Sequence, residues 1–412
     1  MRPRLLFLCQ TLPFPPDGGV AIRSYNTLRL LAERYDVTSL CFYRRAVMKD
    51  VVASVDALRR LGGELEAFPI EQEHGRVRLL TDHLRSVTQG RVYTVAAYES
   101  GPFRRRLTGL LAARRFDLAH VDSLDLSAYL PLLTDIPTVC VHHNVESSLL
   151  RRRAATESSA ARRAYLRFQA DLMEREERTW CPKVALNVAV SAADRSEFER
   201  IAPGSRFTVV PNGVDIHAFT PGAPADHGIV FVGGMTWFPN KDALQYFARD
   251  ILPLLRAAGC TDPVNWVGRA LPGATEAYAA QGIHLTGYVD DIRPHVHAAA
   301  CYIVPLRVGG GTRLKILDAW AMGKAVVSTS VGCEGLETRD GWNILIRDEP
   351  RAFAEAVRQV LADPALRASL GTNARETAER IYSWDVIGES MFADYEAVRL
   401  GAAPTARSTT AA

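Results

Sequence analysis

One segment near residue 310 combines residue types that suit the binding of a phosphorylated ligand. The glycines Gly309–Gly311 follow an apolar run, and a helix is predicted to begin near Thr312 and to end at Gly323. Glycines let backbone N–H groups approach an oxyanion, and a helix N-terminus adds partial positive charge. Arg313, predicted in the first helical turn, adds a cation, and Asp318 is placed to accept sugar hydroxyls. The alternative to a phosphate-binding loop is a flexible glycine loop with a chance arginine.

A second glycine pair lies near the N-terminus. Gly18 and Gly19 follow the apolar run Leu5–Cys9 and precede a helix that is predicted to begin near Val20. Their backbone could approach a diphosphate or an acceptor molecule. A turn built from prolines and glycines for structural reasons remains the alternative.

Two further positions follow predicted strands. The pair His142-His143 ends an apolar run, and the alternation of side chains along a strand predicts that the two rings face different ways. A structural role in the core is the alternative for either histidine. Glu334 lies between Gly332 and Gly335, after another strand, where it either meets a ligand or is solvated.

Short apolar or β-branched runs alternate with longer amphipathic segments along the chain, which is typical of βαβ units and parallel sheets. The predicted strands are Leu5–Cys9, Val37–Phe42, Leu118–Val121, Thr138–His142 and Val184–Val190 in a first series, and Thr208–Pro211, Gly228–Val232, Val264–Val267, His284–Thr286, Cys301–Val304, Ala325–Ser328 and Asn343–Ile346 in a second. We expect two doubly wound lobes that bind the ligand in a cleft, at the carboxyl ends of their strands.

The pattern also predicts how the chain is divided. An N-terminal domain is expected over residues 1–205 and a C-terminal domain over residues 206–383, because Pro203-Gly204 interrupts the pattern. A terminal helix is predicted over residues 384–400. The small and polar residues 401–412 are predicted to be disordered.

The segment Gly309–Lys324, followed by Val327–Leu336, resembles the donor-binding signature of glycosyltransferase family 4, whose members are retaining enzymes with the GT-B fold. The similarity extends in order to Pro15–Gly19, His143–Glu146, Val190-Ser191 with Asp194, Pro211–Asp215, Phe231–Gly234 and Thr286–Tyr288. The resemblance implies an α/β GT-B architecture, with two Rossmann-like doubly wound domains facing a cleft and a C-terminal helix returning to the first domain.

The resemblance also implies roles for particular residues, with some departures. Members usually carry two glutamates with seven residues between them; the second maps to Asp318, and the first falls on Gly310, which has no carboxylate. Gly234 stands where the family has an arginine, and Lys241 is the candidate for the family's lysine, although Asn240 competes for the place. The implied catalytic residues are His143, near the transferred sugar, and Arg313. Residue patterns and the resemblance together give the expected donor-binding residues, which are Gly18, Gly19, Gly234, Lys241, Gly310, Gly311, Thr312, Asp318 and Glu334.

These features predict a retaining transfer from a UDP- or GDP-sugar to a polysaccharide, glycolipid or lipid-linked acceptor. The chain contains no Asp-x-Asp motif, so we expect no metal site and no cofactor. Preorganised backbone dipoles and Arg313 would stabilise the leaving diphosphate. A nucleotide-sugar epimerase on the same scaffold and a non-catalytic sugar-nucleotide-binding protein are the alternatives.

Charge and cysteine usage bear on partners and location. The net charge of +3 is too small to argue for nucleic acid, but residues 1–206 hold 31 Lys and Arg against 24 Asp and Glu, and residues 207–412 hold 18 against 22. A basic first half suits a peripheral contact with an anionic inner membrane, or a phosphorylated substrate. Seven scattered cysteines predict reduced thiols, and no apolar run is long enough to span a bilayer, so we expect a cytoplasmic protein.

Overall fold

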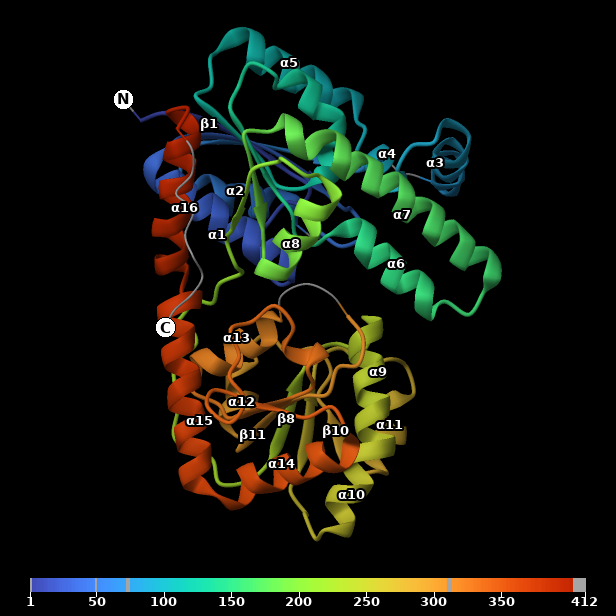
Figure 1. Ribbon diagram of the computed structural model, residues 1–412, viewed down its shortest axis with the longest axis vertical. Helices are drawn as coiled ribbons and strands as arrows, with labels where there is room; N and C mark the ends of the chain where they lie inside the picture. Colours follow the sequence, from blue (N-terminus) through green and yellow to red (C-terminus); the bar gives the residue numbers. More distant parts are fainter. Residues whose placement is uncertain (1, 49, 72–74, 310–312, 403–412) are drawn as a thin grey trace. The chain divides into compact units, whose positions relative to one another are not determined.

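Two parallel sheets organise the chain in the computed structural model, which describes residues 2–48, 50–71, 75–309 and 313–402. The first sheet has the strand order β3-β2-β1-β4-β5-β6-β7, and the second has the order β10-β9-β8-β11-β12-β13. Helices surround both sheets (Figure 1), so the strands are buried on both faces and consist of nearly continuous apolar runs. The predicted α/β class with two Rossmann-like units is confirmed.

The first unit comprises Met1–Val210 and Gly388–Ala412. Its strands are β1 (Arg4–Cys9), β2 (Asp36–Tyr43), β3 (Glu64–Pro69), β4 (Leu118–Val121), β5 (Thr138–Val141), β6 (Leu186–Ala189) and β7 (Phe207–Val209). Its α-helices are α1 (Gly19–Arg34), α2 (Val51–Arg59), α3 (Arg76–Gln89), α4 (Tyr93–Ala97), α5 (Gly101–Ala113), α6 (Glu146–Thr156), α7 (Ala160–Trp180) and α8 (Ala192–Ile201), with 3-10 turns at Leu124–Leu132 and Cys181–Lys183. Helices α6 and α7 form a hairpin at one side of this unit (Figure 1).

The second unit comprises Pro211–Ile387. Its strands are β8 (Ile229–Val232), β9 (Val264–Val267), β10 (Ile283–Leu285), β11 (Cys301–Val304), β12 (Val326–Ser328) and β13 (Leu345–Ile346). Its helices are α9 (Phe238–Tyr246), α10 (Leu252–Ala257), α11 (Ala274–Ala279), α12 (Arg293–His297), α13 (Leu314–Ala321), α14 (Pro350–Ala362) and α15 (Pro364–Thr377), with π-helical turns at Phe247–Ile251 and Ala378–Tyr382 and a 3-10 turn at Val331–Cys333. Trp266, Trp320, Phe231 and Phe247 are fully or almost fully buried in its core.

The division between the units differs from the prediction. Strand β7 was expected to open the second sheet, yet it pairs in parallel with β6 in the first sheet, from Asn187 with Phe207 to Ala189 with Val209. The first unit therefore continues to Val210, beyond the expected boundary at residue 205. The predicted tail falls largely on residues 403–412, which lie outside the described residues.

The C-terminal helix α16 (Trp384–Arg399) returns to the first unit, as the family resemblance implied. From Gly388 onward it belongs to that unit, where Asp394 accepts a hydrogen bond from Thr208. Leu30 of α1 packs against the helix so tightly that a Cβ at Gly388 would lie 2.8 Å from the leucine side chain. Among the helices that the structure describes, none is both long and apolar enough to cross a bilayer.

Candidate active site

A buried carboxylate organises the carboxyl ends of β1 and β4 in the first unit. Asp122 directly follows β4, and its Oδ2 accepts hydrogen bonds from the hydroxyl of Ser24 (2.6 Å) and the thiol of Cys9 (3.2 Å). His120 Nε2 lies 3.4 Å from Oδ1. Burial disfavours the charged carboxylate, but His143 and His120 outweigh this cost and hold the pKa of Asp122 well below its usual range. Asp122 is therefore a fixed negative charge.

Asp122 connects His143 to the C-terminal helix. Nε2 of His143 is buried, makes no hydrogen bond to a described residue, and lies 3.4 Å from Oδ2 of Asp122. On the other side, Nδ1 of His120 lies 2.7 Å from the hydroxyl of Tyr395 in α16. Burial lowers the pKa of His120, so this ring is neutral between the tyrosine and the carboxylate. Helix α16 thereby helps to position Asp122, which faces His143.

The two adjacent histidines face different partners, as the strand alternation predicted. His142 Nε2 lies 2.9 Å from Oδ1 of Asn187, and its ring packs at 4.4 Å from the ring of Phe198. Burial lowers the pKa of His142 to about 4, which marks it as a neutral core histidine. His143 instead meets Asp122 and is the member of the pair that is available for chemistry.

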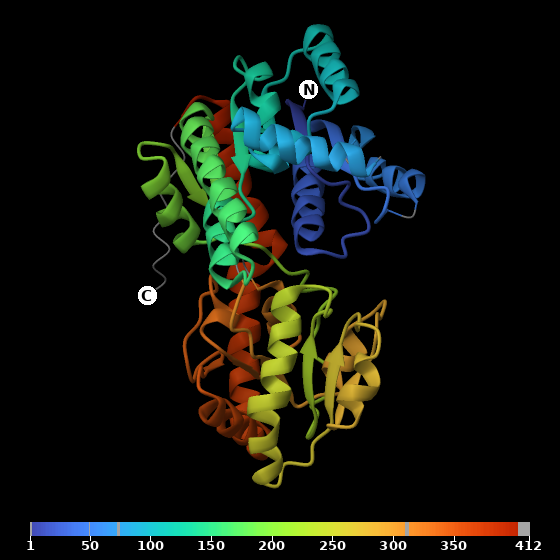
Figure 2. The same ribbon diagram turned by 90° about the vertical axis from the view of Figure 1, so that its right-hand side faces the viewer.

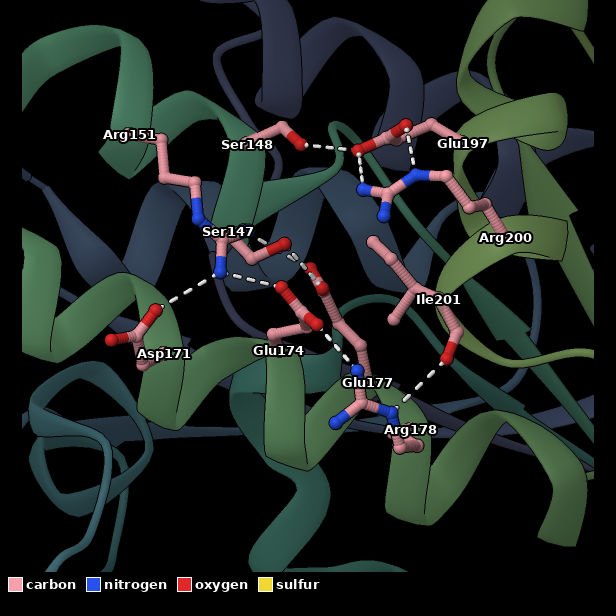
Figure 3. Close-up of polar contacts among 10 residues, drawn as sticks. All are labelled: Ser147, Ser148, Arg151, Asp171, Glu174, Glu177, Arg178, Glu197, Arg200 and Ile201. Atoms are coloured by element: carbon pink, nitrogen blue, oxygen red, sulfur yellow. Dashed lines mark hydrogen bonds and ion pairs between the residues drawn. The ribbon is translucent and has the colours of Figure 1, made fainter. Parts of the chain in front are cut away.

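Helix α6 starts three residues after His143 and is anchored to α7. The carboxylate of Glu177 accepts hydrogen bonds from the backbone N–H (3.1 Å) and the hydroxyl (2.5 Å) of Ser147, and Arg151 pairs with Asp171 at 3.0 Å (Figure 3). These contacts satisfy donors at the start of α6 and hold the segment that carries His143.

Glu146, the first residue of α6, is a further acid close to His143 in the sequence. Its Oε1 accepts a hydrogen bond from Asn144 at 3.1 Å, and burial together with Asp125 raises its pKa to about 7. The side chain can therefore exchange a proton near neutral pH, which suits a residue that contacts a hydroxyl group.

The predicted glycine pair lies at the N-terminus of α1. Gly18 is the N-cap of this helix, which has no side-chain cap, and a Cβ at Gly18 would meet nothing within 4 Å. Its φ of −141° is one that any residue adopts. Neither strain nor packing explains this glycine, so the open space beside Gly18 is compatible with a ligand at the helix N-terminus.

In the second unit, a half-buried lysine, Lys315, lies beside the glycines that follow β8. Nζ of Lys315 donates a hydrogen bond to Oδ1 of Asn240 (2.7 Å), and the amide of Asn240 donates to the carbonyl of Gly234 (3.0 Å). A Cβ at Gly233 would lie 2.6 Å from the amide nitrogen of Asn240 and 2.7 Å from Nζ of Lys315, so a larger residue would displace both side chains. Burial and Arg313 lower the pKa of Lys315 well below its usual value. An anion at this site would compensate for both effects.

Lys315 was missed by the sequence analysis, which assigned the family's lysine to Lys241. Asn240, the competitor considered for the place, is the residue that contacts the turn after β8. Among the described residues, the side chain of Lys241 makes no hydrogen bond or ion pair. The signal that could have found Lys315 is its position two residues after Arg313. Gly234 is partly explained by packing, since a Cβ there would lie 3.3 Å from the backbone nitrogen of Arg269.

Arg313 is the N-cap of α13 and does not lie in the first helical turn, so that prediction is wrong in detail. The guanidinium is 3% exposed and donates from Nε and Nη2 to the carbonyl of Val331, at 3.2 and 3.1 Å. Nη2 also lies 3.8 Å from Oε2 of Glu334. The structure thus brings Arg313 and Glu334 together at the start of α13, as expected for two residues of one site.

Asp318 lies one turn beyond Lys315 on α13 and is partly buried. Burial raises the pKa of Asp318 to about 7, so the carboxylate is costly to ionise in the unliganded protein. Hydroxyl groups of a ligand would favour the ionised form. Gly310, Gly311 and Thr312, which were also predicted to bind the donor, lie outside the described residues.

These groups could bind a nucleotide diphosphate and its sugars at the carboxyl ends of β8 and β11. Lys315 and Arg313 would meet the phosphates, and Asp318 would accept hydroxyl hydrogen bonds. Within the described ranges, no group of three His, Cys, Asp or Glu side chains could hold a metal ion. All seven cysteines are free thiols, in agreement with the prediction of reduced cysteines.

Comparison with known proteins agrees with this reading. The family described as "Glycosyltransferase Family 4" matches residues 17–218, and the family described as "Glycosyl transferases group 1" matches residues 226–363. A lipopolysaccharide core biosynthesis glycosyltransferase of Rhizobium meliloti (strain 1021) is 32% identical over 124 residues, which are 28% of this chain and 35% of that protein. A lipopolysaccharide core biosynthesis mannosyltransferase of Rhizobium leguminosarum bv. viciae is 24% identical over 53% of this chain and 63% of its own length. Both matches span less than two thirds of these relatives.

Solved structures share the fold over nearly the whole chain. A sucrose-phosphate synthase from Thermosynechococcus elongatus has a TM-score of 0.69 at 18% identity and covers 97% of this chain and 100% of its own. The Anabaena protein HepE in complex with UDP has a TM-score of 0.64 at 16% identity and covers 94% of this chain and 98% of its own. The two family models match in the expected order, and the fold is that of GT-B enzymes. The chain therefore belongs to the group 1 glycosyltransferases of glycosyltransferase family 4.

Proposed function

We propose that the protein transfers a sugar from a UDP- or GDP-sugar to a polysaccharide, glycolipid or lipid-linked acceptor, with retention of configuration and without a metal ion. The observation that carries the proposal is the half-buried Lys315 beside Gly233 and Asn240, on the same helix as Asp318 and close to Arg313 in the sequence. The ammonium group of Lys315 contacts the neutral amide of Asn240 and lies 4.0 Å from the centroid of the Phe231 ring, so an anionic ligand would add a charge-assisted contact.

The relatives support the donor and acceptor classes. Two of them are named for lipopolysaccharide core biosynthesis, and the Anabaena fold neighbour was solved with UDP and with UDP-glucose. We therefore propose that this chain acts in the biosynthesis of a cell-envelope glycan. The basic first half of the sequence leads us to propose a cytoplasmic location with a peripheral contact at the inner membrane.

The chain's own residues suggest how the transfer proceeds. The bond between the anomeric carbon and the phosphate oxygen breaks, and the electron pair stays on the diphosphate, where Lys315 and Arg313 stabilise the charge. The acceptor hydroxyl bonds to the same face of the sugar and gives its proton to the departing phosphate. His143, positioned by Asp122, contacts the transferred sugar near its reacting carbon.

A thermal-shift screen against UDP, GDP, ADP and their common sugar conjugates tests the proposal, first without metal and then with magnesium. A ligand at a hundred times its Kd stabilises the protein by about 2.7 kcal/mol, which is readily measured. We expect a shift with UDP or GDP compounds in the absence of metal, and its loss in Lys315→Ala. Product analysis by NMR then reports the anomeric configuration. A shift that requires magnesium, or an inverted product, would contradict the proposal.

A further inference from the structure

Helix α3 of the first unit has its polar side turned inward. Asp82 is 1% exposed and Ser86 is fully buried. Ser86 Oγ accepts a hydrogen bond from the amide of Gln169 in α7 at 2.5 Å, and Nδ1 of His83 lies 2.6 Å from the hydroxyl of Tyr165 in the same helix. These contacts fix the rotation of α3, because they join it to α7 through two successive turns.

The opposite side of α3 is an exposed apolar stripe, defined here as Val77, Leu80, Leu84 and Val87. These side chains are 76%, 70%, 61% and 52% exposed. Their spacing of three, four and three residues places them on one face of the helix. A surface helix of a globular domain normally buries its apolar face, so α3 is reversed with respect to that arrangement.

The surroundings of the stripe are basic. The sequence of α3 holds three arginines and one acid, Asp82, which is buried and accepts a hydrogen bond from Arg78 at 3.0 Å. Residues 160–170, the half of α7 that packs on α3, hold three arginines and no acid. Of these cations Arg85, Arg162 and Arg167 are exposed. Helix α3 lies at the outer side of its unit (Figure 1 and Figure 2).

We propose that the apolar stripe of α3 and its flanking arginines dock the protein on an anionic lipid bilayer. The stripe would enter the boundary between headgroups and acyl chains, and the arginines would meet lipid phosphates, as in an amphipathic helix that lies in the interface. Charge favours a bilayer over a second copy of this chain, because a symmetric contact would place the same cations opposite one another. This inference names the surface that would make the membrane contact of the proposed function. It depends on the proposed function only in assuming that the acceptor lies at a membrane.

Co-sedimentation of the full chain with vesicles tests the proposal without any sugar transfer. We expect binding to phosphatidylcholine vesicles that contain phosphatidylglycerol and weaker binding to phosphatidylcholine alone. The double variant Leu80→Gln/Leu84→Gln should lower the partition coefficient at least about tenfold, since two exposed leucines lose their insertion. Arg85→Gln should lower it about fivefold at low salt. Val52→Gln is the matched control, because Val52 is 72% exposed on α2 of the same unit.

Several results would overturn the proposal. One is wild-type protein that stays in solution with both kinds of vesicle at low salt; another is a leucine variant that binds as the wild type does. Light scattering tests whether the stripe instead binds a second copy of this chain. A wild-type protein that is a dimer, together with a leucine variant that is a monomer, would assign the stripe to a dimer interface. The thermal shift with UDP and GDP, measured for every variant, reports the proposed function separately, and we expect it to be unchanged in the leucine variant.

Discussion

The raised pKa of Asp318 leads to a quantitative prediction about stability. A folded-state pKa of about 7 lies about three units above the ordinary value for aspartate. The folded protein therefore binds this proton more tightly than the unfolded chain does, and the free energy of unfolding falls as the pH rises between these two values. At about 1.4 kcal/mol per unit, the carboxylate costs at most about 4 kcal/mol when it is fully ionised.

Asp318→Asn removes this cost, because the amide has nearly the same shape and does not ionise. We expect the variant to be more stable than the wild type, with a gain near pH 8 that exceeds the gain near pH 5.5 by about 2 kcal/mol. Urea denaturation of both proteins at the two pH values measures the difference. Asp340→Asn is a suitable control: Asp340 lies in the same unit, is exposed, and its pKa is lowered, with Arg347 as a partner, so it should show no such gain.

The same variant should bind the nucleotide donor more weakly. If Asp318 accepts hydroxyl hydrogen bonds as a carboxylate, wild-type affinity rises between about pH 6 and pH 8, and the asparagine variant loses about tenfold in affinity near pH 8. Isothermal calorimetry at both pH values measures this change in affinity.

In the stability experiment, a difference between the two proteins that does not depend on pH would refute the reasoning that burial alone raises the pKa of Asp318. An asparagine variant that is less stable than the wild type at both pH values would refute it as well.

The other predictions concern the cations and the carboxylate in the first unit. Lys315→Ala should weaken donor binding between about tenfold and a hundredfold, because a charge-assisted contact is lost. Lys241→Ala should change donor binding little. Calorimetry compares the two variants, and equal losses of affinity would contradict the assignment of Lys315. Arg313→Ala should lower turnover at least about tenfold with partial rescue by lysine, and wild-type rates would remove Arg313 from the mechanism. Asp122→Asn should lower kcat about tenfold or more, and adding His143→Ala should cost no more than His143→Ala alone; fully additive losses in this double-mutant cycle would show that the two residues act independently.

Local patterns in the sequence were sufficient to predict much of the fold. Strands β1, β4, β9 and β11 form where apolar runs were found, because each run fills a position buried on both faces of a parallel sheet. Strand β3 was missed: its sequence, Glu-Leu-Glu-Ala-Phe-Pro, has half-exposed positions at a sheet edge and therefore carries a weaker apolar signal.

The sequence also located part of the candidate site. Arg313 and Asp318 were proposed from the glycine-rich segment, since residue type and spacing suffice where a loop and the helix that follows it form one local unit. Glu334 was proposed from its own glycine-flanked turn, and it lies 3.8 Å from Arg313. Asp122 was overlooked, although it directly follows a predicted strand, the place where such residues were sought. Its importance depends on Ser24, Cys9 and the histidines around it, which are distant in the sequence or on neighbouring strands.

By itself, then, the sequence determined the alternation of strands and helices, the family resemblance and the residues that share a turn or a helix with the glycine loop. Only the tertiary structure decided that β7 joins the first sheet, that Asn240 contacts the turn after β8 and in turn binds Lys315, and that α3 turns its apolar stripe outward. Each of these depends on contacts between distant segments: the pairing of β7 with β6, the packing of Asn240 against Gly234, and the hydrogen bonds from α7 to α3. Periodicity defines which side chains share a face, but the partner that covers this face is set by packing across the fold.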